Sequence, residues 1–494
     1  MADTYVLGID QSTQGTKALL FDGYGRMIRR SDVPHRQIVN DKGWVEHDAA
    51  EILGNVYLAV RKLLDDPADA ARIGAVGICN QRETVAAWDR RTGEPVGNAI
   101  VWQCARGSEI CREAGVQEAA RLIRERTGLT LSPYFSAAKM SWILKHREAA
   151  RKLAEQGYLC LGTMDSFLIW HLTEERHFYT DYSNASRTQL YNIMTLQWDD
   201  EIGRIFGVGS ECLPEVHGSD EVFGLTDLGG ILPKAVPLCG VIGDSQGALF
   251  GQGCHLPGMV KATYGTGSSI MLNIGNTPLI SEAGIVTSLA WGIENKVQYV
   301  LEGNVNNAGA VITWLQNVLG LISSPADCEE MARQALGQDR TYLVPAFTGL
   351  GAPYWDSEAQ GLISGITRTT GPNEIVRAAL DSIAYQISDI VFLMEREAGC
   401  GLKELRVDGG PTANGYLMQF QSDLTGLPVR VPQEEELSGI GAAYLAGISS
   451  GIYRQETLFS NPARAVYRPQ MSTEIRAGKL DGWKEAVGRV LYRG

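Results

Sequence analysis

The same short pattern occurs twice in this chain and constrains its fold more than any other feature: a strand, a loop of small polar residues and a second strand. The first copy runs from Tyr5 to Phe21 with its loop at 10–17, and the second runs from Val260 to Leu272 around Gly265–Gly267. Small residues at a hairpin tip let backbone N–H groups approach a ligand closely. The repeat is one of plan rather than of sequence, and it predicts two halves with similar architecture.

Between and after the hairpins, apolar segments alternate between strand and helix spacing, an α/β pattern. The spacing predicts a helix from Asp48 to Leu64, with Asp48 as its N-cap, and a buried strand from Ile73 to Ile78. Three elements are expected after the second hairpin: a loop entering a helix within 303–319, a long helix within 368–395 and a strand at 405–407. Because 494 residues are too many for one core, we predict two domains, residues 1–248 and 249–494.

The composition argues against several classes of protein. Lys and Arg number 44 against 57 Asp and Glu, a net charge of −13, whereas nucleic-acid-binding proteins need a basic face. No apolar run is long enough to span a bilayer, and the first residues lack the basic segment and apolar stretch of a secretory signal. The nine cysteines include no Cys-x-x-Cys pair and are expected as reduced core residues. We therefore expect a cytoplasmic protein that binds neither nucleic acid nor membrane.

The two hairpin tips carry groups that suit phosphoryl transfer, which needs gripped phosphates, a metal ion and an acceptor hydroxyl aimed in line. The candidate phosphate donors are Thr13, Thr16 and Lys17 in the first tip and Thr266, Gly267 and Ser268 in the second. Asp10, at the end of the first strand, is placed to hold Mg²⁺ through water. Either loop alone is more often an ordinary glycine-containing hairpin. The assignment depends on finding both, together with a third loop at Gly409-Gly410.

Two longer motifs resemble the FGGY family of carbohydrate kinases, within the actin-like ATPase superfamily. Residues 134–146 are similar to the first family signature, and residues 361–366 with 374–381 are similar to the second. Within the family, four more segments resemble the glycerol kinase branch: 80–84, 101–104, 349–356 and 417–423. The resemblance covers nearly the whole chain. It implies an α/β fold of two actin-like (ribonuclease H-like) domains with a catalytic cleft between them.

The resemblance also implies a role for individual residues. Asp244 matches the general base that takes the proton of the acceptor hydroxyl. The implied substrate contacts are Arg82, Glu83, Trp102, Tyr134, Asp244, Ser245 and Ser269. The implied nucleotide and phosphate contacts are Thr13, Gln14, Lys17, Thr266, Gly267, Gly309, Thr313, Gly410 and Asn414, with Asp10 for the metal. ATP and Mg²⁺ follow as cofactors, a small polyol or sugar as substrate, and a homodimer or homotetramer as the assembly common among relatives.

These residue types suit a substrate with neighbouring hydroxyls. A diol removed from water must regain its hydrogen bonds, and Arg82 donates where Glu83 accepts. The alternative, a solvated charge pair on a loop, is disfavoured because the two residues close a buried apolar strand. Asp244 has an alternative interpretation as the N-cap of the helix that follows it. Trp102, taken alone, is more often a core residue than a ligand wall.

Two residues depart from the glycerol kinase pattern. Ser245 stands where that branch typically has Gln, and Ser269 stands where it typically has an aromatic residue. Removing a Phe from a pocket frees on the order of 100 Å³, which favours a four- or five-carbon polyol or pentulose. Thr313 stands where the family often has Gln near the adenine.

Three alternatives remain open. Two are enzymes of the same family: a glycerol kinase proper, or a xylulokinase or other pentulose kinase. The third comes from another class, a nucleotide-gated scaffold of the actin or Hsp70 type. Such a scaffold would need neither the Arg82-Glu83 pair nor a base at Asp244.

Overall fold

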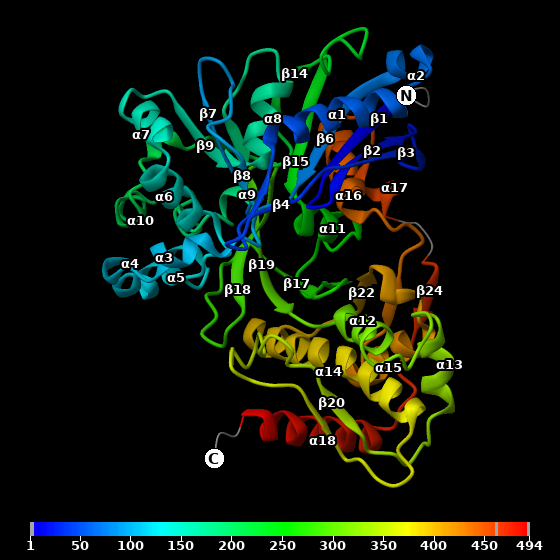
Figure 1. Cartoon of the computed structure of the whole chain (residues 1–494). Helices are drawn as coiled ribbons and strands as arrows, with labels where there is room; N and C mark the ends of the chain where they lie inside the picture. The colour runs from blue at the N-terminus through cyan, green and yellow to red at the C-terminus, as the bar shows by residue number, and fades with distance from the viewer. Residues whose placement is uncertain (1–3, 460–462, 492–494) are drawn as a thin grey trace.

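Two mixed β-sheets form the frame of the computed structural model, which describes residues 4–459 and 463–491 (Figure 1). In order across the first sheet, the strands are β14 (Val222–Thr226), β15 (Val236–Gly243), β6 (Ile73–Asn80), β1 (Tyr5–Gln11), β2 (Gly15–Phe21) and β3 (Met27–Pro34). In order across the second sheet, they are β18 (Val286–Ile293), β19 (Lys296–Val305), β17 (Ser268–Gly275), β16 (Val260–Tyr264), β22 (Leu405–Asp408), β23 (Val429–Val431) and β24 (Ala465–Tyr467).

Each sheet contains one of the predicted hairpins beside a parallel strand. β1 pairs antiparallel with β2, where Asp10 faces Lys17, and parallel with β6. β16 pairs antiparallel with β17, where Tyr264 faces Ser268, and parallel with β22. The predicted repeat of plan is confirmed.

Smaller strands and the helices surround the two sheets. In order across a third sheet, the strands are β4 (Ile38–Val39), β5 (Val45–His47), β8 (Ala99–Ile100), β7 (Val85–Asp89) and β9 (Leu159–Thr163). Three two-stranded sheets pair β10 (Tyr179–Asp181) with β13 (Glu215–His217), β11 (Tyr191–Asn192) with β12 (Gln197–Trp198) and β20 (Tyr342–Val344) with β21 (Leu362–Ser364). The helices up to the end of β15 are α1 (Ala49–Leu63), α2 (Pro67–Arg72), η1 (Ala105–Gly107), α3 (Ser108–Cys111), α4 (Ala114–Glu118), α5 (Ala120–Thr127), α6 (Ser136–His146), α7 (Glu148–Glu155), α8 (Met164–Leu172), α9 (Tyr182–Ala185), α10 (Asp200–Phe206) and η2 (Ser210–Cys212). Those that follow are α11 (Asp244–Gly251), α12 (Gly309–Asn317), α13 (Asp327–Gln334), α14 (Pro372–Ala398), η3 (Gly410–Ala413), α15 (Gly415–Thr425), α16 (Leu437–Ser449), α17 (Gln455–Leu458) and α18 (Thr473–Leu491). Within the described residues, no helix is both long and apolar enough to cross a membrane.

The first sheet is covered on both faces, as the apolar runs of its strands require. Leu7 and Leu20 pack on the face that carries α1 and α8. Val6 and Leu19, one residue along, pack on the opposite face against α11 and α16. α16 comes from the far end of the sequence and lies beside the first strands (Figure 1).

This packing bears on the proposed division of the chain. A boundary between residues 248 and 249 falls inside α11, and α16 lies on the first sheet although it follows the second. α11 and α16 approach so closely that a Cβ on Gly441 would lie 1.9 Å from the carbonyl oxygen of Gly247. The domain limits 1–248 and 249–494 stay a prediction.

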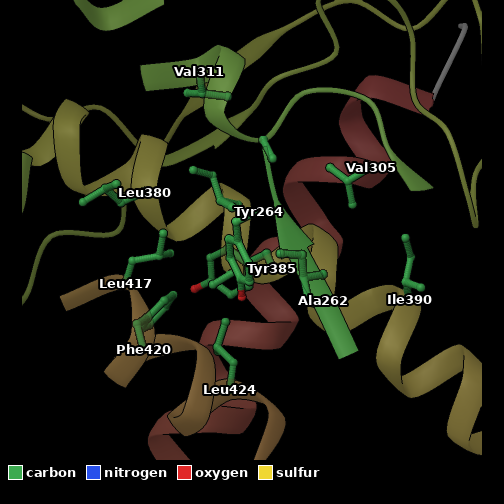
Figure 2. Packing of buried hydrophobic residues seen from close by; sticks show 14 of the residues in the cluster. Ala262, Tyr264, Val305, Val311, Leu380, Tyr385, Ile390, Leu417, Phe420 and Leu424 are labelled. Carbon is green, nitrogen blue, oxygen red and sulfur yellow. The ribbon is translucent and has the colours of Figure 1, made fainter. Parts of the chain in front are cut away.

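The second sheet has a core of its own. Figure 2 shows Tyr264 of β16, Tyr385 of α14 and Phe420 of α15 in one buried cluster. The ring centroids of Tyr385 and Phe420 are 5.5 Å apart in an edge-to-face arrangement, and Tyr264 donates its hydroxyl to Gln421 at 2.8 Å. This packing holds α14 and α15 against the sheet that carries the second hairpin.

Most sequence-predicted elements lie where they were expected. Asp48 caps α1 and accepts hydrogen bonds from the N–H groups of Ala50 and Glu51. The prediction for 303–319 was wrong at its start, because β19 continues through Gly303 to Val305 and the helix begins only at Gly309.

Candidate functional site

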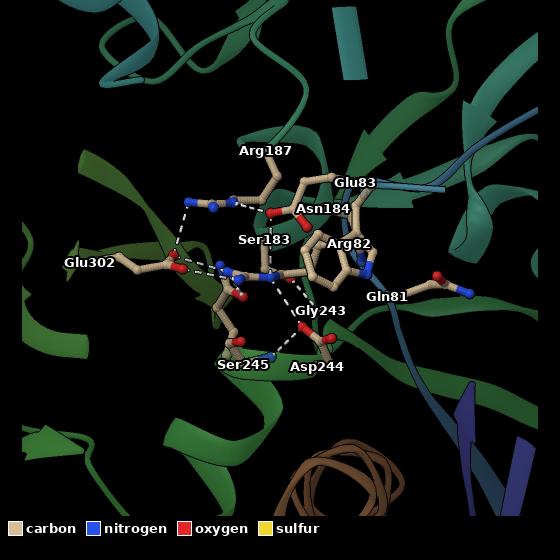
Figure 3. Close-up of polar contacts among 12 residues, drawn as sticks. Gln81, Arg82, Glu83, Ser183, Asn184, Arg187, Gly243, Asp244, Ser245 and Glu302 are labelled. Atoms are coloured by element: carbon tan, nitrogen blue, oxygen red, sulfur yellow. Dashed lines mark hydrogen bonds and ion pairs between the residues drawn. The ribbon is translucent and has the colours of Figure 1, made fainter. Parts of the chain in front are cut away.

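Two parallel strands of the first sheet end side by side and carry the central charged residues. β6 ends at Asn80 and β15 ends at Gly243, and these two residues are partners in the strand register. Arg82 follows β6, and Asp244 follows β15 as the first residue of α11. Because the carboxyl ends of parallel strands meet at one edge, the two side chains come together. Arg82 Nε lies 3.0 Å from Asp244 Oδ1 (Figure 3).

The guanidinium group of Arg82 is hydrogen-bonded through both terminal nitrogens, whereas among the described residues Nε makes only ion-pair contacts, with Asp244 and Glu83. Glu302 of β19 binds both terminal nitrogens, Nη1 through Oε2 and Nη2 through Oε1, each at 3.0 Å. Nη1 also donates to Gln246 Oε1 at 3.0 Å. The side chains of Arg82 and Glu83 are each only 4% exposed. The alternative of a solvated charge pair is therefore wrong.

A second arginine completes the cluster. Arg187 Nε donates to Glu83 Oε1 at 2.7 Å, and Arg187 Nη1 lies 2.9 Å from Glu302 Oε2. Arg82 Nε is 3.7 Å from Glu83 Oε1, so the four side chains form a ring of alternating charge. Burial alone would raise the pKa of Glu302, but Arg187 and Arg82 lower it to about 2. Glu302 is therefore charged at neutral pH, and so is Arg82, whose pKa the neighbouring carboxylates raise.

Sequence reasoning missed Arg187 and Glu302. The available signal for Glu302 was a single carboxylate within the apolar run of β19, since a buried charge requires a partner. Its partners come from the first half of the chain, and no local pattern identifies them.

Asp244 occupies the start of α11 with part of its carboxylate free. The N-cap residue is Gly243, so the alternative interpretation of Asp244 as the N-cap is wrong by one position. Oδ1 accepts the N–H of Ser245 at 2.6 Å as well as the Arg82 contact. The side chain remains 35% exposed. Burial and nearby Glu83 raise the pKa of Asp244, while Arg82 opposes the shift. The group suits a proton acceptor.

A buried polar network fixes the backbone immediately before Asp244. The hydroxyl of Ser183 accepts the N–H of Gly243 at 2.8 Å and donates to the carboxylate of Asp181 at 2.8–2.9 Å. Next to it, Asn184 exchanges side-chain hydrogen bonds with Asn80 at the end of β6. Figure 3 shows Ser183 and Asn184 behind the charged cluster. The network therefore joins the ends of both strands that carry the site.

Trp102 and Tyr134 lie together at the edge of the site. Their ring centroids are 5.4 Å apart, and both side chains are only partly buried. Trp102 Nε1 donates to Thr13 Oγ1 at 2.9 Å, so it links the aromatic pair to the first hairpin tip. Behind the pair, the fully buried amine of Lys139 donates to the carbonyl oxygens of Tyr134 and Phe135. Trp102 is thus partly exposed at the edge of the site rather than buried in the core.

Asp10 and Lys17 face each other across the first hairpin. Lys17 Nζ lies 3.9 Å from Asp10 Oδ2 and also binds the carboxylate of Glu436. Burial raises the pKa of Asp10 to about 6, against the opposing effects of Lys17 and of the Cys79 thiol, which donates to Asp10 Oδ1 at 3.3 Å. Gln14, at the tip, is exposed.

The residues around Asp10 fit a magnesium ion that is held mainly by phosphates. In the part of the chain that the structure describes, no three His, Cys, Asp or Glu side chains are grouped as metal ligands. Mg²⁺ usually keeps several waters and is bound through one or two carboxylates plus substrate phosphates. Asp10 provides one such buried carboxylate, and the negative charge of Asp244 contributes to its raised pKa.

The second hairpin tip is bound to the start of α12. Thr266 accepts the N–H groups of Ala308 and Ala310 through its carbonyl oxygen, at 2.9 and 3.0 Å. Gly309 donates its N–H to the carbonyl oxygen of Gly265 at 2.8 Å, and a Cβ on Gly309 would lie 2.6 Å from that oxygen. Glycine is therefore required at position 309 for the helix to approach the tip.

Three more predicted nucleotide contacts lie near this tip. Gly409 has φ +96°, and a Cβ there would lie 1.9 Å from the carbonyl oxygen of Tyr264, which places exposed Gly410 next to the hairpin. Thr313 is exposed one turn into α12, and Asn414 is the N-cap of α15, accepting the N–H of Leu417 at 3.0 Å. The predicted residues thus form two groups, one around Asp10 and Asp244 and one around Thr266 and Gly309.

Ser269 faces the charged cluster. In β17 it pairs with Asn304, while Met271 pairs with Glu302, so the side chains of Ser269 and Glu302 lie on the same face of the second sheet. Ser269 Oγ is buried and has no hydrogen-bond partner among the described residues. Ser245, directly after Asp244, is half-buried.

Comparisons with known proteins agree over the whole chain. The model of the FGGY family of carbohydrate kinases, N-terminal domain, matches residues 5–251, and that of its C-terminal domain matches residues 260–450. The chain is 47% identical to "Glycerol kinase 1" of Thermotoga maritima over 490 residues, 99% of each protein. It is 46% identical to the glycerol kinase of Alkaliphilus oremlandii, over 99% of this chain and 97% of that protein.

Solved structures give the same result for the fold. A crystal structure of Plasmodium falciparum glycerol kinase with ADP superimposes with a TM-score of 0.94 at 34% identity, over 99% of both chains. The xylulose kinase from Rhodospirillum rubrum superimposes with a TM-score of 0.88 at 19% identity, over 98% of both chains. At that identity, the second likeness concerns the fold alone.

Proposed function

We propose that Asp244 is the general base of this chain, which belongs to the FGGY family of carbohydrate kinases. The chain is an ATP-dependent phosphotransferase that acts on an alcohol group of a polyol. The predicted family, the fold of two actin-like domains and the kinase activity are confirmed. The scaffold alternative is thereby excluded. The observation that supports the base is the 3.0 Å contact of Asp244 Oδ1 with the Nε of Arg82, a member of the buried charged ring.

The acceptor hydroxyl would meet Asp244 at its second oxygen. Both contacts of the carboxylate given above engage Oδ1, so Oδ2 would take the acceptor hydroxyl. A neighbouring hydroxyl would be placed by Arg82 and Glu83, one donating and one accepting. Trp102 and Tyr134 would cover the carbon chain from the side. A carboxylate in hydrogen-bond reach orients the hydroxyl and accepts its proton as the phosphoryl group transfers.

The nucleotide would lie across the two hairpin tips. We assign the phosphates to Thr13, Gln14 and Lys17, and the rest of the nucleotide to Thr266, Gly267, Gly309, Thr313, Gly410 and Asn414. Asp10 would hold Mg²⁺, which neutralises charge on the transferring phosphate when bound. Lys17 has three N–H donors, so it can bind a phosphate oxygen in addition to Glu436.

Glycerol is the first candidate acceptor, because relatives with 44–47% identity are glycerol kinases. The second candidate is a four- or five-carbon polyol. It is supported by Ser245 and Ser269, small residues where larger ones are typical of that branch, and by the buried Ser269 hydroxyl that lacks a partner. A pentulose acceptor has weaker support, since the xylulose kinase structures are only 17–22% identical.

A coupled assay of ADP release with MgATP tests these candidates. Glycerol, erythritol, pentitols and D- and L-pentuloses are compared by kcat/KM. A glycerol preference supports the first candidate, and a preference of about a hundredfold, or 2.7 kcal/mol, for a longer polyol supports the second. If no polyol stimulates ADP release, the proposed acceptor class is wrong.

We also propose a cytoplasmic location, a homodimer or homotetramer, and no nucleic-acid or membrane partner. All nine cysteines are unpaired, eight of them buried, which suits a reducing compartment. The net charge of −13 opposes binding to nucleic acid or anionic lipid. Size-exclusion chromatography with light scattering would establish the assembly.

A further inference from the structure

We propose that Glu302 is a positioning residue of the acceptor site, one that sets the orientation of Arg82 from the second domain. The proposal rests on the proposed function of Arg82 and Asp244. Glu302 lies on β19 of the second sheet, whereas Arg82 and Asp244 lie at the edge of the first. Its side chain has no exposure to solvent.

Glu302 fixes the plane of the Arg82 guanidinium group. The two carboxylate oxygens take Nη1 and Nη2 at 3.0 Å each, a fork-to-fork arrangement that allows one orientation. With both terminal nitrogens engaged, the Nε edge is the one that faces Asp244. Figure 3 shows Glu302 on the opposite side of Arg82 from Asp244.

Gln246 supports the same orientation. Its Oε1 accepts from Arg82 Nη1 at 3.0 Å, and its Nε2 donates to the carbonyl oxygen of Leu289 on β18 at 3.1 Å. Two adjacent strands of the second sheet therefore hold Arg82, β19 directly and β18 through Gln246.

The arrangement keeps Arg82 from blocking the base. A guanidinium group beside a free carboxylate tends to bind both of its oxygens. If Arg82 turned its terminal nitrogens to Asp244, it would take Oδ2, the oxygen assigned to the acceptor hydroxyl. Within the ring, the positive charges of the two arginines are balanced by the negative charges of the two glutamates. No guanidinium group of the ring is therefore left to bind both oxygens of Asp244.

The test compares Glu302→Gln with Glu302→Asp and a matched control. In Glu302→Gln we expect the KM for the polyol to rise at least tenfold and kcat/KM to fall about a hundredfold, the loss typical of a displaced catalytic group. The KM for MgATP should stay within threefold. Glu302→Asp keeps the charge and should recover part of the loss.

The control is Glu282→Gln. Glu282 also forms a pair with an arginine of the other domain, Arg124, at 3.7 Å, but it is 88% exposed. Exposed pairs contribute little, so both KM values and kcat should remain those of the wild type. A loss in this control equal to that in Glu302→Gln would show that any contact between the domains has the same effect, and would overturn the proposal.

A purely structural role gives a different pattern. It predicts a lower melting temperature and fewer active sites, with unchanged KM values in the folded fraction, and that result overturns the proposal. If Glu302→Gln does not fold, Glu302→Asp decides: a raised polyol KM supports the proposal, and wild-type KM values refute it.

Crystal structures without ligand separate this proposal from the proposed function. In Glu302→Gln, or in Glu302→Asp if that alone folds, Arg82 Nε should leave its position 3.0 Å from Asp244 Oδ1. If the contact persists, Glu302 does not position Arg82, whatever the substrate. If the wild type phosphorylates no polyol but the contact is lost, the proposed function fails and the positioning role stands.

Discussion

Replacing Asp244 by Asn removes a proton acceptor while preserving its shape. Oδ1 of Asn can still accept the N–H of Ser245, now at 2.6 Å, and can stay next to Arg82 Nε, now 3.0 Å away. Arg82 also keeps Glu302 as a bidentate partner. The start of α11 and the charged ring should therefore survive the change. Two properties are lost: the negative charge and the ability to take a proton.

The size of the effect follows from these contacts. Proton transfer by a positioned side chain contributes about 10²–10⁴ in rate, or about 2.7–5.4 kcal/mol. We expect kcat to fall by that factor. One hydrogen bond to the substrate contributes about 0.5–1.5 kcal/mol net, so the KM for the polyol should change about tenfold at most. The substitution should thus act on kcat far more than on KM.

The assay is steady-state ADP release at saturating MgATP with the best polyol, alongside thermal unfolding. The exposed residue Asp41 provides the control, Asp41→Asn, which should leave kcat and KM unchanged. The melting temperature of Asp244→Asn should stay close to that of the wild type. If Asp244→Asn keeps kcat within threefold of the wild type, another group is the base and the assignment is refuted.

Three further predictions test other parts of the site. Burial raises the pKa of Asp244 above 3.8, the ordinary pKa of an aspartate, so kcat/KM should fall as the pH drops through that raised pKa. A loss of kcat/KM that begins only at or below pH 3.8 would contradict this. Gly409 has φ +96°, and Gly409→Ala would place a Cβ 1.9 Å from the carbonyl oxygen of Tyr264. Calorimetry of this variant should show weaker ATP binding with unchanged polyol binding. An ATP affinity equal to that of the wild type would exclude this loop from the nucleotide site. Ser269→Phe fills on the order of 100 Å³ and should lower kcat/KM for pentitols relative to glycerol, whereas an unchanged ratio would place Ser269 outside the acceptor pocket.

Local chemistry predicted the parts of the fold that depend on neighbours in sequence. The hairpin at 5–21 follows from two apolar strands around a small polar loop, and it forms with Asp10 opposite Lys17. The cap of α1 follows from Asp48 ahead of an amphipathic segment. The position of Arg82 at a strand end also follows, because the predicted buried strand at 73–78 leads into it.

Long-range partners could not be predicted in the same way. α16 is apolar around its whole circumference, which predicts burial but not that it packs on the first sheet. Glu302 is a buried acid whose arginine partners lie 220 and 115 positions earlier, as the numbering of Arg82 and Arg187 shows. The end of β19 was placed too early because Glu302 and Gly303 are poor strand residues by themselves. The cost of Glu302 is offset by its ion pairs with Arg82 and Arg187 from the first half of the chain.

The central claim is that the buried ring of Arg82, Glu83, Arg187 and Glu302 presents a polyol hydroxyl to Asp244. A crystal structure with a polyol and a non-hydrolysable ATP analogue tests it most directly. The account predicts the acceptor hydroxyl about 2.6–3.2 Å from Asp244 Oδ2, with a neighbouring hydroxyl on Arg82 and Glu83. A polyol bound away from Asp244, or one whose reacting hydroxyl contacts a different acid, would contradict the account.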